Sequence, residues 1–383
     1  MTRNQRTPGS TNPFVFARPL APDELVDREA ELALLAERRE AGVNTRLASP
    51  RDYGKTSLLN RAIEDARKDG AGAVLVDLYG ARTPGQMAAQ IQRAYEDLPA
   101  GPFRKAYAAL SRRGGSVGLH VPVGGASLSL GAGEAGERAL LDALDLPLRL
   151  HERTKRPILV AFDEFQAVLQ ADLDAVIRSV IQHHGGGVTY VFSGSHPGMM
   201  RSLFADRRRP FYGQAAPLQL GRLPRDVLAT YIEDGFTRTG RDVGDALGWL
   251  LDLVDGHPQR AMLFAYLLWR HTGEGAAADD HAREGAYNEA WDYLQGDFEA
   301  TWDSFSRIEA GVVEAIASDI QSLTGRVSRE IHGLPAGSAA PDAAKRLVDE
   351  GVLFRIGDEG NVLGIVDPVF AVWVRQWRHW RFD

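Results

Sequence analysis

The chain has 383 residues, 44% hydrophobic and 25% charged, which is enough to build two or three packed domains and excludes wholesale disorder. The absence of cysteine excludes a disulfide scaffold, a thiolate zinc site and a cysteine nucleophile. The net charge of −7 argues against a dedicated non-specific nucleic-acid binder. The sequence contains no run of 18 apolar residues, so we expect no membrane-spanning helix. We expect a flexible lead over residues 1–12, no signal peptide and a cytoplasmic location.

A parallel α/β sheet is predicted for residues 13–223, where short apolar runs alternate with amphipathic stretches. The expected strands cover 45–48, 73–78, 158–162, 188–192 and, more weakly, 217–220. The expected helices cover 55–69, 84–97, 137–152 and 172–184. A stretch near 115–131 alternates at period two around Gly-Gly, which predicts a β-hairpin inserted into this domain.

A phosphate-binding loop follows the first expected strand and opens a helix. It is a Walker A element in which Ser49 stands where the first glycine is usual. Its backbone N–H groups and the helix N-terminus are suited to phosphate oxygens, and Lys55 reaches the β- and γ-phosphates. The nucleotide-binding residues predicted here are Ser49, Pro50, Arg51, Asp52, Tyr53, Gly54, Lys55, Thr56 and Ser57.

An apolar strand that ends in two carboxylates predicts a Walker B element. Asp163 would hold Mg²⁺ together with the hydroxyl of Thr56. Glu164 would polarise the attacking water, so its presence favours hydrolysis over simple nucleotide binding. The pairing of this strand with the phosphate loop predicts a nucleotide-hydrolysing site.

Two further catalytic candidates follow the fourth expected strand. Ser195 is the candidate for a polar sensor of the γ-phosphate, with Ser193 as the alternative and helix capping as the other interpretation. A run of three arginines at 207–209 could complete the site of a neighbouring subunit as an arginine finger. The sequence does not show which of the three arginines would act, and we take Arg208 as the candidate. The alternative interpretation is that this segment is a solvated loop.

The C-terminal part changes character. Residues 224–302 are helical throughout and predict a helical lid. Residues 303–383 predict helices at 304–319, 327–333 and 340–350 followed by a hairpin at 352–365, which is the order of a winged helix. The expected recognition helix, 341–350, carries two basic and three acidic residues, so DNA contact is possible but not favoured by charge. A protein partner or self-assembly is the preferred expectation.

Over residues 13–378 the sequence resembles a known family, the archaeal-type ATPases of prokaryotes, in the STAND branch of the AAA+-related P-loop NTPases. It is similar, more distantly, to origin-recognition ATPases. The segments that carry the resemblance are Leu25-Val26-Asp27-Arg28-Glu29-Ala30-Glu31-Leu32, Pro50 to Leu59, Phe162-Asp163-Glu164-Phe165-Gln166, Ser193-Gly194-Ser195, Pro210-Phe211-Tyr212-Gly213, Gly256-His257-Pro258 and Asp367-Pro368-Val369-Phe370-Ala371-Val372-Trp373.

The resemblance implies an ATPase domain, a helical lid and a winged helix that bind ATP or ADP with Mg²⁺. It also implies that Val26 and Arg28 lie near the adenine and that Pro258 faces the nucleotide. Ser49 and Asp52 depart from the family pattern. The function expected is an ATP-hydrolysing, nucleotide-controlled switch. The alternatives are an initiator-like or mobile-element ATPase that binds DNA in its ATP form, and a slow, ADP-locked scaffold.

Overall fold

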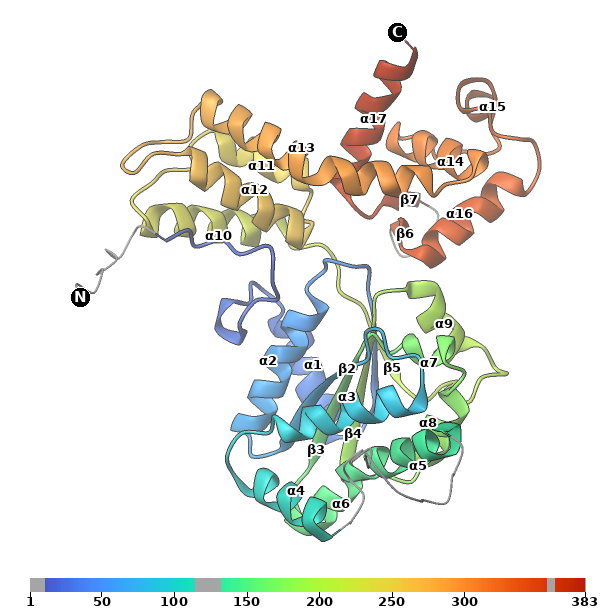
Figure 1. Cartoon of the computed structure of the whole chain (residues 1–383). Helices are drawn as coiled ribbons and strands as arrows, with labels where there is room; N and C mark the ends of the chain where they lie inside the picture. Colours follow the sequence, from blue (N-terminus) through green and yellow to red (C-terminus); the bar gives the residue numbers. More distant parts are fainter. Residues whose placement is uncertain (1–10, 114–131, 357–361, 383) are drawn as a thin grey trace. The chain divides into compact units, whose positions relative to one another are not determined.

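The computed structural model describes residues 11–113, 132–356 and 362–382 (Figure 1). The chain separates into two compact units. We call the one formed by residues 21–49 and 55–220 the sheet unit, and the one formed by residues 1–20, 50–54 and 221–383 the helical unit. The hairpin expected near 115–131 lies outside the described residues. No helix in the described part of the chain is long and apolar enough to cross a membrane.

The sheet unit is built on five parallel strands in the order β2-β3-β4-β1-β5. Their bounds are β1 (Thr45–Ala48), β2 (Gly72–Asp77), β3 (Ile158–Asp163), β4 (Val188–Gly194) and β5 (Ala216–Leu218). Asp77 pairs in register with Asp163, and Ala48 with Gly194. The carboxyl ends of these strands therefore meet at one edge of the sheet, where loops of parallel α/β proteins usually carry their sites.

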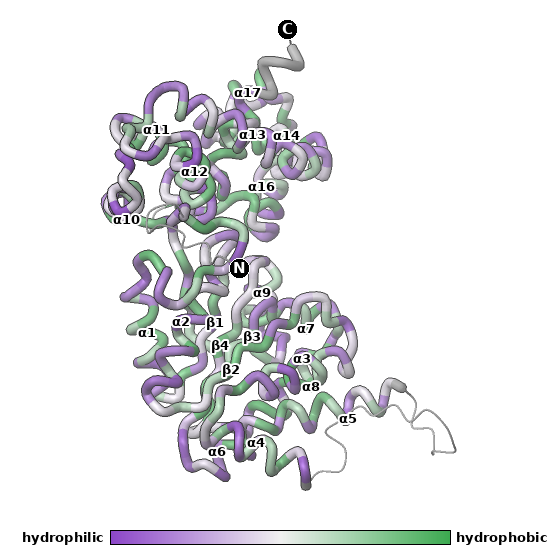
Figure 2. The backbone as a smooth tube through the Cα atoms, turned by 60° about the vertical axis from the view of Figure 1, so that its left-hand side comes forward, coloured by the Kyte–Doolittle hydropathy of each residue, from purple (hydrophilic) through white to green (hydrophobic). Residues whose placement is uncertain are grey.

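Helices cover both faces of this sheet, because β3 and β4 are buried along their whole length. On one face Phe162 stacks between Tyr190 and Phe192, with ring centroids 6.1 and 6.2 Å apart. Strands β2 and β3 show as largely hydrophobic stretches of the tube in Figure 2. The helices of this unit are η1 (Pro22–Glu24), α1 (Glu29–Glu40), α2 (Lys55–Lys68), α3 (Pro84–Glu96), α4 (Pro102–Arg113), α5 (Ala132–Leu144), α6 (Leu146–Thr154), α7 (Ala167–Gln170), α8 (Asp174–Ile181) and α9 (Pro197–Ala205).

The structure differs from the expected helices between β2 and β3. The segment expected as one helix over 137–152 forms two, α5 and α6, with Asp145 between them. Pro147 lies in the first turn of α6, where its missing N–H costs nothing, whereas inside a continuous helix it would remove a hydrogen bond. Helix α4 was not predicted, because the Pro-Ala-Gly-Pro stretch before Phe103 reads as a loop.

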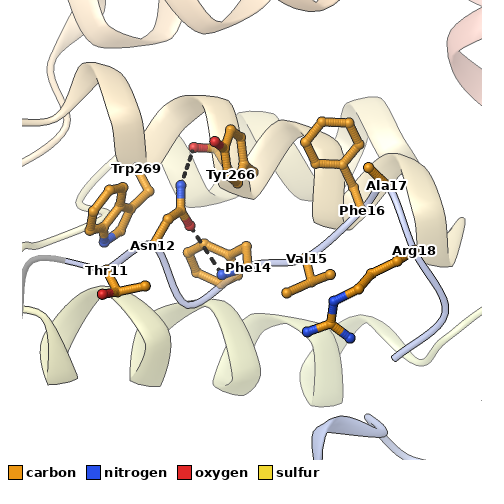
Figure 3. Close-up of a pocket in the computed structure, with 9 residues that line it drawn as sticks. All are labelled: Thr11, Asn12, Phe14, Val15, Phe16, Ala17, Arg18, Tyr266 and Trp269. Carbon is orange, nitrogen blue, oxygen red and sulfur yellow. Dashed lines mark hydrogen bonds between the residues drawn. The ribbon is translucent and has the colours of Figure 1, made fainter. Parts of the chain in front are cut away.

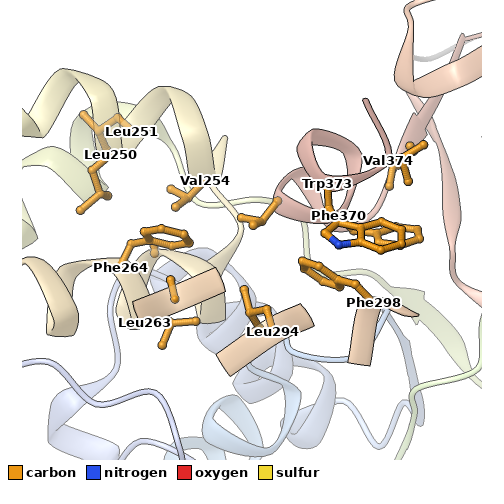
Figure 4. Packing of buried hydrophobic residues seen from close by; sticks show 14 of the residues in the cluster. Leu250, Leu251, Val254, Leu263, Phe264, Leu294, Phe298, Phe370, Trp373 and Val374 are labelled. Carbon is orange, nitrogen blue, oxygen red and sulfur yellow. The ribbon is translucent and has the colours of Figure 1, made fainter. Parts of the chain in front are cut away.

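The helical unit contains four consecutive helices, followed by three more helices, a β-hairpin and a C-terminal helix. Its elements are α10 (Arg225–Arg238), α11 (Ala246–Val254), α12 (Pro258–His271), α13 (Asp280–Asp303), α14 (Arg307–Ala317), α15 (Arg326–His332), α16 (Ala339–Glu350), β6 (Leu353–Ile356), β7 (Val362–Ile365) and α17 (Pro368–Phe382). One continuous hydrophobic core includes residues from each of these elements except α15, and Figure 4 shows part of it. Within it Trp373 stacks on Phe370 at 5.7 Å and packs against Phe298, so the first tryptophan of α17 belongs to the core.

The N-terminal segment packs along this helical unit. Asn12 donates from Nδ2 to the carbonyl of Tyr266, and its Oδ1 accepts from the backbone N–H of Phe14. Phe16 packs edge-on against Tyr266, and the segment borders an open pocket of about 870 Å³ (Figure 3). That pocket contains none of the residues predicted to bind phosphate, so it is not the candidate site.

Candidate functional site

The phosphate loop departs from the usual pattern at Ser49, and the side chain of this serine makes a structural hydrogen bond. Its side chain is fully buried, and its Oγ accepts a hydrogen bond from the backbone N–H of Leu220 at 2.7 Å. This bond ties the end of β1 to the segment that follows β5. The substitution of serine for glycine is thus accommodated by a bond that a glycine could not make.

Lys55 and Thr56 open α2 directly after the loop. Lys55 is buried, and its Nζ donates to the carbonyl of Ser49 at 2.9 Å. The ammonium group is therefore held against the loop backbone, which is where phosphate oxygens bind in sites of this kind. Ser57 is buried behind it in the first turn of α2.

Thr56 and Asp163 join the loop to the end of β3. The hydroxyl of Thr56 donates to Oδ2 of Asp163 at 2.7 Å, although 107 residues separate them. Both side chains offer oxygen atoms, and Asp163 is buried. Mg²⁺ usually takes one or two protein oxygens and completes its shell with water and phosphate, so this pair fits such an ion.

Glu164 sits next to Asp163 in a strained backbone conformation. Its φ is 53°, in the left-handed region that is unusual for a residue with a side chain. Its backbone N–H donates to Oδ1 of Asp163 at 3.0 Å, which helps to hold this turn. Its Oε2 accepts from Oγ of Ser195 at 2.8 Å and from Nε2 of Gln166. The structure thus brings the predicted base and the predicted sensor into direct contact.

The other serine and the arginine run lie differently. Ser193 is fully buried in β4, and its Oγ has no hydrogen-bond partner among the described residues. Arg208 is 88% exposed and pairs with Asp206 at 2.9 Å. Arg209 instead pairs with the buried Asp174 at 3.3 Å. Arg208 is therefore presented to solvent, whereas Arg209 is anchored within the sheet unit.

The residues expected near the nucleotide base fall in two units. Arg28 precedes α1 with φ 85°, is buried, and pairs with Glu31 at 3.0 Å; Val26 nearby is half-buried. Both belong to the sheet unit. Pro258 is the first residue of α12 in the helical unit and is half-buried.

The middle of the phosphate loop, Pro50–Gly54, packs as part of the helical unit. Arg51 and Asp52 are exposed, and Asp52 has φ 65°. Tyr53 is only 4% exposed: its hydroxyl donates to the carbonyl of Val366 at 3.2 Å, and its ring meets His257 edge-on at 5.0 Å. A loop residue is thus fixed to the segment before α17.

Charged groups surround His257 and the start of α17. Arg260 donates to Oδ2 of Asp367 from Nε at 2.8 Å and from Nη2 at 2.7 Å. Burial opposes ionisation of Asp367, but Arg260 and His257 hold the pKa of its carboxyl below the ordinary value. Burial also lowers the pKa of His257 to about 4, with Asp367 acting in the opposite direction and Arg260 and Arg222 in the same one. His257 is neutral at pH 7.

His257 should make the helical unit less stable in acid. Between pH 6.5 and about 4 the unfolded histidine takes up a proton that the folded one does not. The free energy of unfolding should therefore fall with decreasing pH by up to about 1.4 kcal/mol per unit from this residue alone. The contribution of this residue to the pH dependence disappears above about pH 7.5, where the unfolded histidine is also neutral.

Urea unfolding followed by tryptophan fluorescence measures this effect, because all seven tryptophans lie in residues 249–380 of the helical unit. His257→Gln should flatten the slope over that pH window. His281→Gln is the control, because His281 is an exposed histidine of the same unit. An equal slope in wild type and His257→Gln would contradict the assignment.

Three features of the site were missed by the sequence analysis. These are the contact of Gln166 with Glu164, the anchoring of Tyr53, and the bond from Leu220 to Ser49. The bonds made by Tyr53 and Ser49 each join residues more than 170 positions apart, so no local pattern signals them. Gln166 was noted only as part of a family motif. Its position two residues after Glu164 was the available signal.

No family model and no curated protein matches this sequence. Among solved structures the chain is similar to the Walker-type ATPase PABY2304 of Pyrococcus abyssi, with 21% identity and a TM-score of 0.68 over 94% of this chain and 99% of that one. It is also similar to the ORC2 protein of Aeropyrum pernix in ADPNP-ADP complexes, with 16% identity and a TM-score of 0.54 over 95% and 98% of the two chains. These likenesses confirm the predicted fold class, an α/β fold with a P-loop NTPase parallel sheet.

Proposed function

We propose that this chain binds ATP and hydrolyses it with Mg²⁺, and that the bound nucleotide controls the state of its helical unit. The observation that carries the proposal is the 2.7 Å hydrogen bond between Thr56 and Asp163, which joins the two halves of a phosphate and metal site. Adenine nucleotides are supported by the family resemblance and by the ADPNP and ADP named for the similar ORC2 structure.

The proposed chemistry assigns one task to each group. Lys55 and the loop N–H groups bind the β- and γ-phosphates, and Thr56 and Asp163 hold the magnesium ion. When bound, Mg²⁺ neutralises charge that develops on the phosphate oxygens. Glu164 accepts a proton from water as the water oxygen bonds to the γ-phosphorus and the bond from that phosphorus to the β–γ bridging oxygen breaks. ADP and inorganic phosphate leave, and Ser195 keeps the carboxylate oriented.

The switch is supported by the packing of Tyr53. A change in loop conformation on phosphate binding would move a ring that is bonded to Val366 and packed on His257. The order of α14, α15, α16 and the β6–β7 hairpin supports a winged helix in this unit. We infer that the nucleotide state is transmitted through this contact to the helices around α17. A protein partner or a second copy of the chain is the proposed recipient.

Tryptophan fluorescence tests this transmission, since it reports the helical unit alone. Saturating ATP should change the fluorescence of wild type, and Tyr53→Phe should reduce the amplitude of that change because it lacks the hydroxyl that reaches Val366. Tyr212→Phe, which removes an exposed hydroxyl of the sheet unit, is the control. Binding is measured separately by anisotropy of a fluorescent ATP analogue. An unchanged amplitude in Tyr53→Phe at saturation would refute the proposed route.

Phosphate release from ATP by the purified full chain tests the hydrolytic half of the proposal. Release should require Mg²⁺. A chain that retains nucleotide through purification and releases no phosphate would instead fit a nucleotide-locked scaffold.

A further inference from the structure

Gln166 stands out because it is a buried polar side chain that the proposed chemistry does not use. It is only 5% exposed and lies at the carboxyl edge of the sheet, two residues after Glu164. Its Nε2 donates to Oε2 of Glu164 and also to Oγ of Ser195 at 3.3 Å. Ser195 in turn donates to the same Oε2 at 2.8 Å. The three side chains form a closed triangle of hydrogen bonds.

The orientation of the amide follows from this triangle. Both hydrogens of Nε2 are used, one toward the carboxylate and one toward the hydroxyl. Turning the amide over would set its carbonyl oxygen against the carboxylate oxygen, which is repulsive. The remaining atom, Oε1 of Gln166, is buried without a hydrogen-bond partner among the described residues. The protein thus leaves a buried acceptor unsatisfied, which is unfavourable, while the donor of the same amide stays in place.

Gly194 makes room for the amide. A Cβ at this position would lie 2.5 Å from Oε1 of Gln166 and 2.5 Å from Sδ of Met200. Any larger residue at the end of β4 would displace either Gln166 or the methionine behind it. The short sequence Ser193-Gly194-Ser195 therefore supplies both the space for Gln166 and the hydroxyl that completes the triangle.

The two donors converge on one oxygen of Glu164. In the described part of the chain, Oε1 of Glu164 has no hydrogen bond or ion pair, so it keeps its full capacity as a proton acceptor. Holding one carboxylate oxygen and leaving the other free selects one rotamer of a side chain whose backbone is already strained. This is the arrangement expected of a base that must be aimed before its substrate water arrives.

We propose that Gln166 is a positioning residue for Glu164. It fixes Oε2, with Ser195, so that Oε1 faces the attacking water. The inference rests on the proposed function, because it needs Glu164 to act as the base. It goes beyond that function because it assigns the orientation of the Glu164 carboxylate to a residue that has no part in the proposed nucleotide or metal binding.

The first test replaces the amide by an apolar side chain of similar length. Gln166→Met removes both donors and also the unsatisfied acceptor, so the cost to folding should be small. We expect kcat for ATP hydrolysis to fall by about 10–100-fold, because a misaimed group reacts much more slowly. KM should stay within about threefold, since Gln166 does not bind the phosphates. Gln182→Met, at an exposed glutamine of the same unit, is the matched control and should match wild type.

The second test is a pH profile that a merely structural role would not move. Gln166→Glu places a second carboxyl beside Glu164, and two such groups at hydrogen-bond distance cannot both ionise readily. At about pH 6 the shared proton lets the new carboxyl donate to Oε2. At about pH 8 both groups are ionised and repel each other. The ratio of variant to wild-type kcat should therefore fall as pH rises, while the ratio for Gln166→Met stays flat.

Each outcome decides the proposal. Unchanged kcat in Gln166→Met overturns it, and a raised kcat overturns it in favour of a contact that holds Glu164 back. If Gln166→Met loses ATP binding through misfolding, the pH profile of Gln166→Glu decides, and a flat ratio there overturns the proposal. Wild type that releases no phosphate overturns the proposed function and this inference together. Active wild type with normal Gln166→Met overturns only the inference.

Discussion

Glu164→Gln should lower kcat for ATP hydrolysis by about 10²–10⁴-fold, the contribution typical of a positioned general base. The amide has the same size and can still accept a hydrogen bond from Ser195, but it cannot take a proton from water. Nucleotide affinity should change little, because Lys55 and Thr56 remain. Phosphate release and anisotropy of a fluorescent ATP analogue, measured on the same preparation, separate the two effects.

A matched control for this variant is Glu152→Gln, which neutralises an exposed carboxylate in the same unit and should hydrolyse ATP as wild type does. Residual activity above a tenth of wild type in Glu164→Gln would remove this residue from the role of base. The variant also tests Arg208, which is exposed. If Arg208 acts on a neighbouring subunit, mixing Glu164→Gln with Arg208→Ala should restore activity that neither has alone.

The central site could be predicted from the sequence because its parts are local motifs on parallel strands. A strand, a Gly-Lys-Thr loop and a helix specify where Lys55 and Thr56 lie. A buried strand that ends in Asp163 and Glu164 must present them at the same sheet edge. The structure places Thr56 against Asp163 and Ser195 against Glu164, as expected for side chains at the carboxyl ends of neighbouring parallel strands.

The supporting contacts could not be predicted because they depend on packing between distant segments. Whether Gln166 turns toward Glu164 depends on the space left by Gly194, which is 28 positions further along the chain. The alternation that identified the sheet says nothing about the hydroxyl of Ser49, which bonds to a backbone group beyond β5. Tyr53 reads as an ordinary loop residue until the segment before α17 packs over it. Sequence patterns specify helices and strands, but they do not specify which polar atoms of distant segments come within hydrogen-bond distance.

Gly256 precedes His257, and among the described glycines of the helical unit we expect it to be the most costly to replace. Its φ is 71°, which favours glycine, and an added Cβ would lie 2.5 Å from the carbonyl oxygen of Leu223. The backbone N–H of Leu223 donates to the carbonyl of Gly256 at 2.8 Å, so the two segments cannot separate without breaking that bond. Gly256→Ala should therefore lower the free energy of unfolding by about 3 kcal/mol or more, from conformational strain and overpacking together.

Gly240→Ala separates these two causes. Gly240 also has a positive φ, 69°, and belongs to the same unit, but an added Cβ would meet nothing within 4 Å. Its cost should be limited to conformational strain, about 1–2 kcal/mol. Urea unfolding followed by tryptophan fluorescence compares both variants within the helical unit. Equal losses in the free energy of unfolding would show that the backbone near Leu223 shifts to accommodate the added Cβ without a further loss of stability. A larger loss for Gly256→Ala would show that the turn before His257, on which Tyr53 packs, is held by a contact that admits no side chain.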